Sequence, residues 1–206
     1  KMKIIKDVVQ GSEAWHSMRL GKVTASRMAD VISKGRGKSP SKTSETYMIE
    51  LITEIITGSA KPFFENEAMR WGTETEDQAR AMYELNSGNE VEEVAFIEHS
   101  DHVGVSPDGL IRDDGLLEIK CPASTTQIKR ALSDSYSEEY KAQIQMQLWV
   151  SGREWCDFLS FDPRIDCDAS YLLERVYRDE NYIAEMEVKT FSFVENMIEQ
   201  LNKLTK

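Results

Sequence analysis

The chain has 206 residues, of which 40% are hydrophobic and 30% are charged. This composition excludes a disordered, collagen-like or membrane-spanning chain and predicts a single globular domain over residues 1–206. The sequence does not open with a charged and then apolar leader, and its three cysteines form no close-spaced pair that would indicate a disulfide framework. We therefore expect a cytoplasmic protein with reduced thiols.

The charges are unevenly distributed along the chain. The formal net charge of -11, taken alone, argues against a nucleic-acid partner, because an acidic surface repels phosphate. Residues 1–42, however, hold 10 lysines and arginines against 3 acidic residues, whereas the rest of the chain holds 15 against 33. Residues 34–42 carry four positive charges and no negative one, which is typical either of a solvated loop or of a loop that contacts phosphate.

Helices dominate the first half of the predicted structure. A short strand is expected at residues 4–9, and the spacing of apolar residues then indicates helices. Ser12 and the segment 24–26 offer helix caps, and Gly58 offers a helix stop. The predicted helices run from about residue 12 to 21, 24 to 33, 43 to 57 and 66 to 87.

From Glu90 onward the apolar residues alternate, as they do in strands. Asp113-Asp114-Gly115 predicts a hairpin turn, because Asp-Gly tolerates the positive backbone angles that such a turn requires. The order of elements favours an α/β fold with a mixed central β-sheet flanked by helices. We expect a meander of strands at 91, 94–97, 103–105, 109–111 and 116–119, then helices at 124–133, 137–151 and 180–204 and strands at 155–161 and 170–177.

Two carboxylates and an amine stand out on either side of the predicted hairpin. Glu118 and Lys120 lie two apart in a strand and share a face, while Ile119 points away into apolar packing. Pairing of the two strands across the turn would bring Asp108 to the same face. Clustered carboxylates need neutralisation, which a hard divalent cation supplies while it keeps water for chemistry. Lys120 beside them is placed to hold or deprotonate an attacking water.

The sequence Pro-Asp followed by Glu-x-Lys resembles the PD-(D/E)xK nuclease core, which is restriction-endonuclease-like. Further matches make the whole chain similar to the phage lambda exonuclease family. They follow one another in the family's order: Trp15 to Gly21 with Thr24 to Ser26, Trp71-Gly72 before Glu76, Ser106 to Leu110, Leu117 to Pro122, and Tyr140 to Gln145 before Trp149.

This resemblance implies a 5′-to-3′ exonuclease that acts on linear double-stranded DNA with 5′-phosphorylated ends. The enzyme would degrade the 5′-ended strand and leave a 3′ single strand for annealing-type recombination. The resemblance also implies a processive homotrimeric ring, a single-strand annealing protein as partner, and a phage or prophage gene expressed in a bacterial cytoplasm. The cofactor would be Mg²⁺, for which Mn²⁺ can substitute, as two ions per active site.

The resemblance also assigns roles to individual residues. Asp108, Glu118 and the backbone carbonyl of Ile119 would bind metal, Glu76 would be a third carboxylate for a second ion, and Lys120 would position or activate the water. Three residues would hold the terminal 5′ phosphate, and three more would line the active site or contact DNA. The first three are Arg19, Ser26 and Arg36, and the others are Tyr140, Gln143 and Met69, of which Met69 falls where the family has a base-pair wedge.

Simpler explanations exist for most of these residues. A lone carboxylate is usually a solvated surface group, Arg19 can simply cover Trp15, and Ser26 can serve only as a helix cap. Three other functions also fit the sequence at this point. They are an endonuclease on the same core, a catalytically silent protein that binds DNA ends, and an acidic interaction protein whose motif matches arise by chance.

Overall fold

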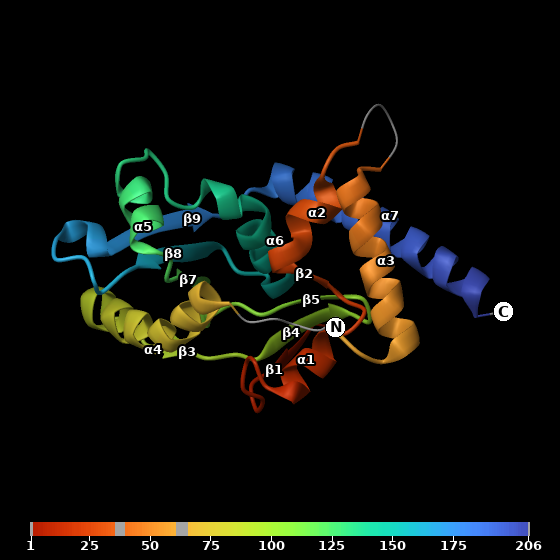
Figure 1. The fold of residues 1–206 in the computed structure, drawn as a ribbon, viewed down its shortest axis with the longest axis horizontal. Coiled ribbons are helices and arrows are strands. Elements are labelled where there is room, and N and C mark those ends of the chain that lie inside the picture. Colours follow the sequence, from red (N-terminus) through yellow and green to blue (C-terminus); the bar gives the residue numbers. More distant parts are fainter. Residues whose placement is uncertain (1, 36–39, 61–65, 206) are drawn as a thin grey trace.

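The computed structural model describes residues 2–35, 40–60 and 66–205. Its strands form two sheets, with helices packed against both (Figure 1). The four-stranded sheet has the order β1-β4-β5-β2 and the five-stranded sheet has the order β3-β6-β7-β8-β9. The strands are β1 (Lys3–Ile5), β2 (Val23–Thr24), β3 (Val91–Glu92), β4 (Phe96–Ser100), β5 (Val103–Val105), β6 (Gly109–Ile111), β7 (Gly115–Lys120), β8 (Trp155–Phe161) and β9 (Tyr171–Tyr177).

The α-helices connect and cover these sheets. Two of them begin with a single turn of 3-10 helix, η1 (Ala25–Arg27) before α2 and η2 (Glu138–Tyr140) before α6, and a further turn, η3 (Asp168–Ser170), precedes β9. The α-helices are α1 (Glu13–Arg19), α2 (Met28–Ile32), α3 (Lys42–Thr57), α4 (Glu67–Ser87), α5 (Ser124–Ala131), α6 (Lys141–Ser151) and α7 (Glu180–Leu204).

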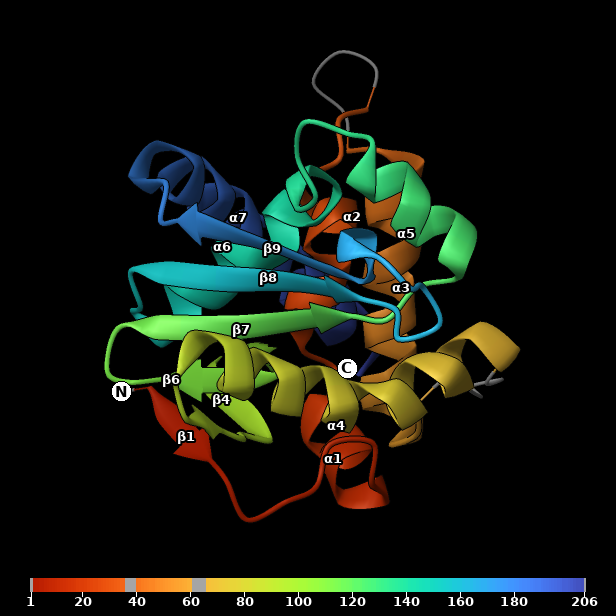
Figure 2. The ribbon, with the colours of Figure 1, turned by 90° about the vertical axis from the view of Figure 1, so that its left-hand side faces the viewer.

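The five-stranded sheet is mixed and lies between two helices. Strands β7 and β8 run parallel and the other neighbours run antiparallel. Helix α4 crosses one face of this sheet (Figure 2), where Tyr83 packs in a buried cluster with Leu117 and Ile119. Helix α6 covers the opposite face, where Ile144 belongs to the same buried core as Leu116. Alternate residues of β7 therefore serve different helices, as the two-residue period of a strand requires.

Most predicted elements are confirmed. Helices α3 and α4 end at Gly58 and Gly88, which both take the left-handed conformation that favours glycine. Ser12 caps α1 by accepting a hydrogen bond from the backbone N–H of Trp15. The α/β class and the mixed sheet are also as expected, and α7 occupies the predicted range.

Three local expectations are wrong. The strands after Glu90 do not form one meander, because β4 and β5 pair in the four-stranded sheet while β3, β6 and β7 pair in the other. In the β6–β7 turn the positive backbone angle falls on Arg112 (φ 49°) and not on Gly115. Gly115 is instead required by packing, because a Cβ there would lie 2.2 Å from the Trp155 ring. The side chain of Thr24 makes no cap hydrogen bond.

Two further expectations concern reduced thiols and the absence of a membrane span. Cys121, Cys156 and Cys167 are all free thiols. None of the helices in the described ranges combines the length and apolar character needed to cross a bilayer.

Candidate active site

The residues singled out around the β6–β7 hairpin meet at the carboxyl end of β7. Gly109 pairs with Leu117, which brings Asp108 alongside the end of the neighbouring strand. The Asp108 Oδ2 atom accepts a 2.6 Å hydrogen bond from the backbone N–H of Ile119. At the same strand end, Lys120 Nζ lies 2.5 Å from Glu118 Oε1. The predicted convergence of Asp108, Glu118 and Lys120 is therefore present.

Glu118 is held from the sheet and from α6 at the same time. Its carboxylate is only 1% exposed, so hydrogen bonds must replace the water it has lost. Gln143 donates to Oε1 at 2.5 Å and Gln147 donates to Oε2 at 2.8 Å. Because these glutamines lie one helical turn apart, α6 presents both amides to one carboxylate. The expected lining role of Gln143 thus corresponds to a direct contact with Glu118.

Glu76 approaches the same site from α4. This helix passes beside the end of β7, since a Cβ added at Gly72 would lie 3.9 Å from the Cys121 carbonyl. Arg80 donates to Glu76 at 2.8 Å. Burial raises the pKa of Glu76, Arg80 opposes that rise, and the nearby charge of Glu118 adds to it. The third carboxylate is therefore close enough to interact with the other two.

The site holds more negative than positive charge. Burial and the charges of Glu118 and Glu76 raise the pKa of Asp108 well above its usual value, despite Lys120 and the Ile119 N–H. Burial alone would lower the pKa of Lys120, but Glu118 and Asp108 outweigh that effect and raise it. Burial followed by the same acidic neighbours raises the pKa of the Cys121 thiol to about 12.

This excess of buried carboxylate fits a hard divalent cation. Asp108, Glu118 and Glu76 would supply oxygen ligands, as Mg²⁺ and Mn²⁺ prefer. Within the described ranges no three Asp, Glu, His or Cys side chains already converge as a complete metal site. Arg80 and Lys120 each hold one of the carboxylates by an ion pair, and Mg²⁺ ordinarily keeps several waters as ligands. The carbonyl of Ile119 as a further ligand stays a prediction, since the contact observed for this residue is made by its N–H.

A cleft of about 840 Å³ opens beside these carboxylates. Glu76 and Asp108 line it, together with residues 6–11 and the start of α4. Met69 also lines the cleft and is 45% exposed, so its side chain is available for contact at the wall. Gln10, which also lines the cleft, donates to the carbonyls of Val94 and Pro107.

Tyr140 forms another part of the site, next to Lys120. The Lys120 Nζ atom lies 5.2 Å from the centre of the Tyr140 ring, and the Arg130 guanidinium lies at the same distance. Arg130 also donates to the Tyr140 hydroxyl at 2.7 Å. Tyr140 and Gln143 thus both contact groups at the end of β7, as the resemblance implies.

The three predicted phosphate-binding residues are placed differently. Arg19 stacks on Trp15 at 4.1 Å and donates to Ser106 Oγ at 3.1 Å, two residues from Asp108. Ser26 is exposed in η1, and no hydrogen bond joins it to Arg19 in the described part of the chain. Arg36 lies outside the described residues. Only Arg19 is therefore tied to the carboxylate cluster by the structure.

Arg19 is largely enclosed by its neighbours. It makes no ion pair with a carboxylate among the residues that the structure describes. Burial lowers the pKa of its guanidinium, with Tyr47 and Glu54 opposing the change. A largely buried cation without a direct ion pair is costly unless an anion joins it, which makes this position suited to phosphate.

Sequence reasoning missed three residues that complete the site. Gln147, Arg80 and Arg130 hold Glu118, Glu76 and Tyr140 respectively. Gln147 and Arg80 each lie four residues after a predicted site residue, Gln143 and Glu76. The helical spacing was therefore a usable signal for these two, whereas Arg130 reaches Tyr140 from the separate helix α5.

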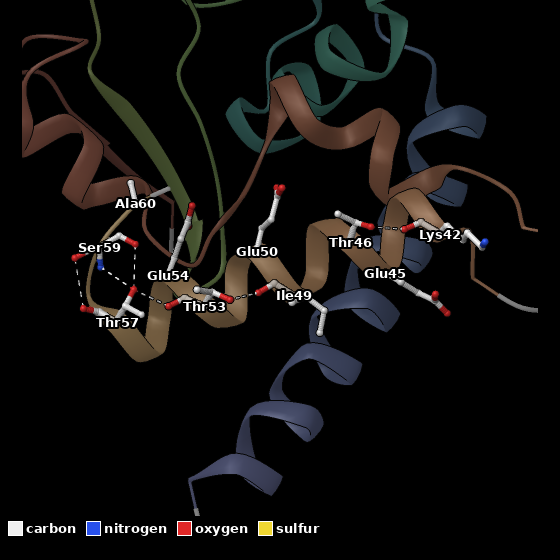
Figure 3. Close-up of a pocket in the computed structure, with 10 residues that line it drawn as sticks. All are labelled: Lys42, Glu45, Thr46, Ile49, Glu50, Thr53, Glu54, Thr57, Ser59 and Ala60. Atoms are coloured by element: carbon white, nitrogen blue, oxygen red, sulfur yellow. Dashed lines mark hydrogen bonds between the residues drawn. The ribbon is translucent and has the colours of Figure 1, made fainter. Parts of the chain in front are cut away.

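A second hollow of about 850 Å³ runs along the outside of α3 (Figure 3). Thr46, Thr53 and Thr57 line it, and each donates its hydroxyl to a carbonyl four residues earlier in the helix. Its other lining residues include Ile49, which is 60% exposed, and Glu45. None of the predicted site residues within the described ranges lines this groove, so it is separate from the candidate active site.

Comparison with known proteins identifies the family of this chain. Residues 14–154 match the model of the YqaJ-like viral recombinase domain. The chain belongs to this family. The predicted resemblance to the phage lambda exonuclease family is thereby confirmed, and the matched residues contain the motifs from Trp15 to Trp149 on which it rests.

Solved structures extend the match beyond the family domain. An alkaline exonuclease from Laribacter hongkongensis, LHK-Exo, is 41% identical to this YqaJ-family chain, with 94% of this chain and 96% of that one covered and a TM-score of 0.86. A phage-related exonuclease from Haemophilus somnus shares the fold, with a TM-score of 0.68 at 16% identity over 90% of this chain and 96% of that one. The expected PD-(D/E)xK-like fold is confirmed by the first match.

A mimivirus protein is related over nearly the whole chain. The uncharacterized protein R354 of Acanthamoeba polyphaga mimivirus is 28% identical over 217 aligned residues, which include 98% of this chain. The chain spans only 37% of that protein's length.

Proposed function

We propose that this YqaJ-family protein is a divalent-metal-dependent exonuclease that acts on linear double-stranded DNA. It degrades the 5′-ended strand in the 5′-to-3′ direction and leaves a 3′ single strand for annealing-type recombination. The observation that carries this proposal is the convergence of Asp108, Glu118 and Lys120 at the end of β7. The 41% identity to an alkaline exonuclease over most of both chains supports the exonuclease class.

In the proposed mechanism each side chain has a separate task. Asp108, Glu118, Glu76 and the Ile119 carbonyl would hold Mg²⁺ or Mn²⁺, as two ions. When bound, the ions stabilise negative charge on the scissile phosphate and make water a better nucleophile. The Lys120 ammonium, next to Glu118 and the Tyr140 ring, orients the attacking water. Gln143 fixes the Glu118 carboxylate against α6.

We propose that Arg19 binds the 5′ phosphate of the strand to be degraded. Its enclosed guanidinium forms no ion pair with a carboxylate of the described residues, and it donates to Ser106, which lies two residues before Asp108. A terminal phosphate bound there sets the distance from the 5′ end to the cleaved bond, so the first phosphodiester falls at the carboxylates. Ser26 and Arg36 are proposed to complete this pocket. Met69, exposed at the wall of the cleft, is proposed to separate the last base pairs.

Assembly and biological setting form part of the same proposal. A homotrimeric ring around DNA would give processive degradation, and the released 3′ strand would pass to a single-strand annealing protein. Family membership supports this arrangement, as does the excess of basic residues in the first 42. The proposed setting is the cytoplasm of a bacterial host, with the gene carried by a phage or prophage. Light scattering tests the assembly, and a monomer mass at working concentrations would contradict it.

A time course on linear duplex DNA tests the activity. The duplex is labelled at either end, with and without 5′ phosphate, and incubated with Mg²⁺, Mn²⁺ or EDTA. We expect mononucleotide release from the 5′-phosphorylated strand only when a divalent ion is present. Products of intermediate length from closed circular duplex would instead indicate an endonuclease, and binding of ends without release would indicate a silent end-binding protein. The fourth possibility, a chance motif match, is removed by the family match over residues 14–154.

A further inference from the structure

Gln147 lies in the buried middle of α6, where a polar side chain is unusual. Every residue from Ile144 to Ser151 is buried, and Gln147 itself is 0% exposed. Its amide nitrogen donates a 2.8 Å hydrogen bond to Oε2 of Glu118. A side chain that approaches the candidate active site from the fully enclosed side is in no position to contact DNA.

The donors around Glu118 are divided between its two oxygens. Lys120 and Gln143 both donate to Oε1, whereas Gln147 is the donor to Oε2. Contacts at both carboxylate oxygens therefore fix the plane of the carboxylate. If Gln147 were removed, Oε2 would be a buried acceptor without its donor, and the carboxylate would be free to turn about its last bond.

Packing alone does not explain a glutamine at this position. The amide oxygen of Gln147 is buried and has no hydrogen-bond partner among the described residues. An unsatisfied buried oxygen is unfavourable, and methionine or leucine would fill a similar volume without it. Gln145, two residues earlier and equally buried, has both ends of its amide bonded, to the Tyr177 carbonyl and the Asp179 N–H. Gln145 is thus a structural glutamine, and Gln147 differs from it.

We propose that Gln147 is a positioning residue that fixes the orientation of the Glu118 carboxylate for divalent-ion binding. This inference rests on the proposed function, because it gives Glu118 the role of a metal ligand. Groups that hold metal ligands in place commonly change metal affinity or activity by about 10- to 100-fold when they are replaced. Gln147 acts only through Glu118 and touches neither metal nor DNA.

The test compares Gln147→Met with Gln145→Met, which makes the same change at an equally buried position of the same helix. Calorimetry measures Mg²⁺ and Mn²⁺ binding, and initial rates on 5′-phosphorylated linear duplex give kcat and KM. For Gln147→Met we expect metal binding that is weaker by about tenfold and a kcat that is lower by about tenfold, with an unchanged KM for DNA. For Gln145→Met we expect a lower Tm with unchanged metal affinity. Gln147→Leu repeats the test with a second apolar side chain.

The outcomes separate this inference from the proposed function. Wild-type metal affinity and kcat in folded Gln147→Met and Gln147→Leu would overturn the positioning role while leaving the nuclease proposal intact. An equal loss of metal affinity in Gln145→Met would show a general packing effect and would also overturn the positioning role. Wild-type protein that neither binds divalent ions nor cleaves DNA would overturn both proposals. Loss confined to the Gln147 variants supports the inference.

Discussion

Two hollows in the described part of the chain have nearly the same volume, about 840 Å³ beside α4 and about 850 Å³ along α3, but they differ in how they are built. The α3 groove is lined by residues of one helix and the turn that follows it, and its threonine hydroxyls bond to the helix itself. The α4 cleft draws its lining from segments as far apart in sequence as Gln10, Glu76 and Asp108.

The acidic side chains of the two hollows also have different surroundings. Around the α4 cleft, burial and neighbouring charges raise the pKa values of Glu76 and Asp108. In the α3 groove, Glu54 accepts a hydrogen bond from the Gly21 N–H and Glu45 is exposed to solvent. Volume alone therefore does not distinguish the candidate active site. Convergence of charged groups from distant segments, at a cost to stability, does distinguish it.

The largest difference between the two hollows should appear when one carboxylate in each is neutralised. Asp108→Asn keeps the size of the side chain and an acceptor for the Ile119 N–H but removes the charge that a divalent ion needs. We expect kcat on linear duplex to fall by about 10³-fold, because a bound ion contributes several kcal/mol to the transition state. Glu45→Gln in the α3 groove is the control and should leave kcat unchanged. Equal rates for Asp108→Asn and wild type would remove Asp108 from the active site.

A smaller loss of kcat is expected when the lysine of the candidate active site is replaced, and a lysine of the α3 groove offers a comparison. Lys120→Ala removes the ammonium beside Glu118, whereas Lys42→Ala removes an exposed ammonium at the α3 groove. Lys120→Ala should lower kcat by about 10²-fold, the usual size for a group that positions or activates a nucleophile, with DNA affinity largely retained. Filter binding and single-turnover rates measure the two effects separately. Near-wild-type turnover in Lys120→Ala would contradict the water-orienting role.

Two arginines can be compared for their effect on recognition of the 5′ phosphate. Arg19 forms no ion pair with a carboxylate of the described residues, whereas Arg27 is paired with Asp30 and Glu50. We expect Arg19→Ala to reduce the preference for 5′-phosphorylated over 5′-hydroxyl ends by about tenfold, because it removes a charge-assisted hydrogen bond. Arg27→Ala should not change that ratio. Competition between the two labelled ends in one tube measures it, and an unaltered ratio in Arg19→Ala places the phosphate elsewhere.

The smallest predicted effect concerns stability without metal. The pKa of Asp108 is raised in the folded protein, so the folded state binds its proton more tightly than the unfolded state does. The Asp108 contribution to stability therefore decreases as pH rises from the unfolded value of 3.8 through the raised folded pKa. In EDTA at pH 7, Asp108→Asn should be more stable than wild type by about 1 kcal/mol, and the gain should shrink near pH 4. Denaturant unfolding at both pH values measures this, and a gain that grows at low pH would reverse the assigned sign.

The sequence determined much of the local structure and the chemical centre of the site. Helical spacing and glycine stops placed α3, α4 and α7, since these signals act within a few residues. Glu118 and Lys120 had to share a face of β7 because strand side chains alternate. Pairing across the predicted hairpin added Asp108, the resemblance added Glu76 as a further carboxylate, and both line the cleft.

Only the tertiary structure decided which neighbours contact these residues and how far the residues are buried. The division of the strands between two sheets depends on pairing between β1 and β4 and between β2 and β5, which are far apart in sequence. The contacts of Gln147 with Glu118, Arg130 with Tyr140 and Arg19 with Ser106 likewise join segments that are far apart in sequence or belong to different elements. Local pattern fixes the direction of a side chain within its own element. Burial, charge and the identity of its neighbour arise only when distant elements pack together.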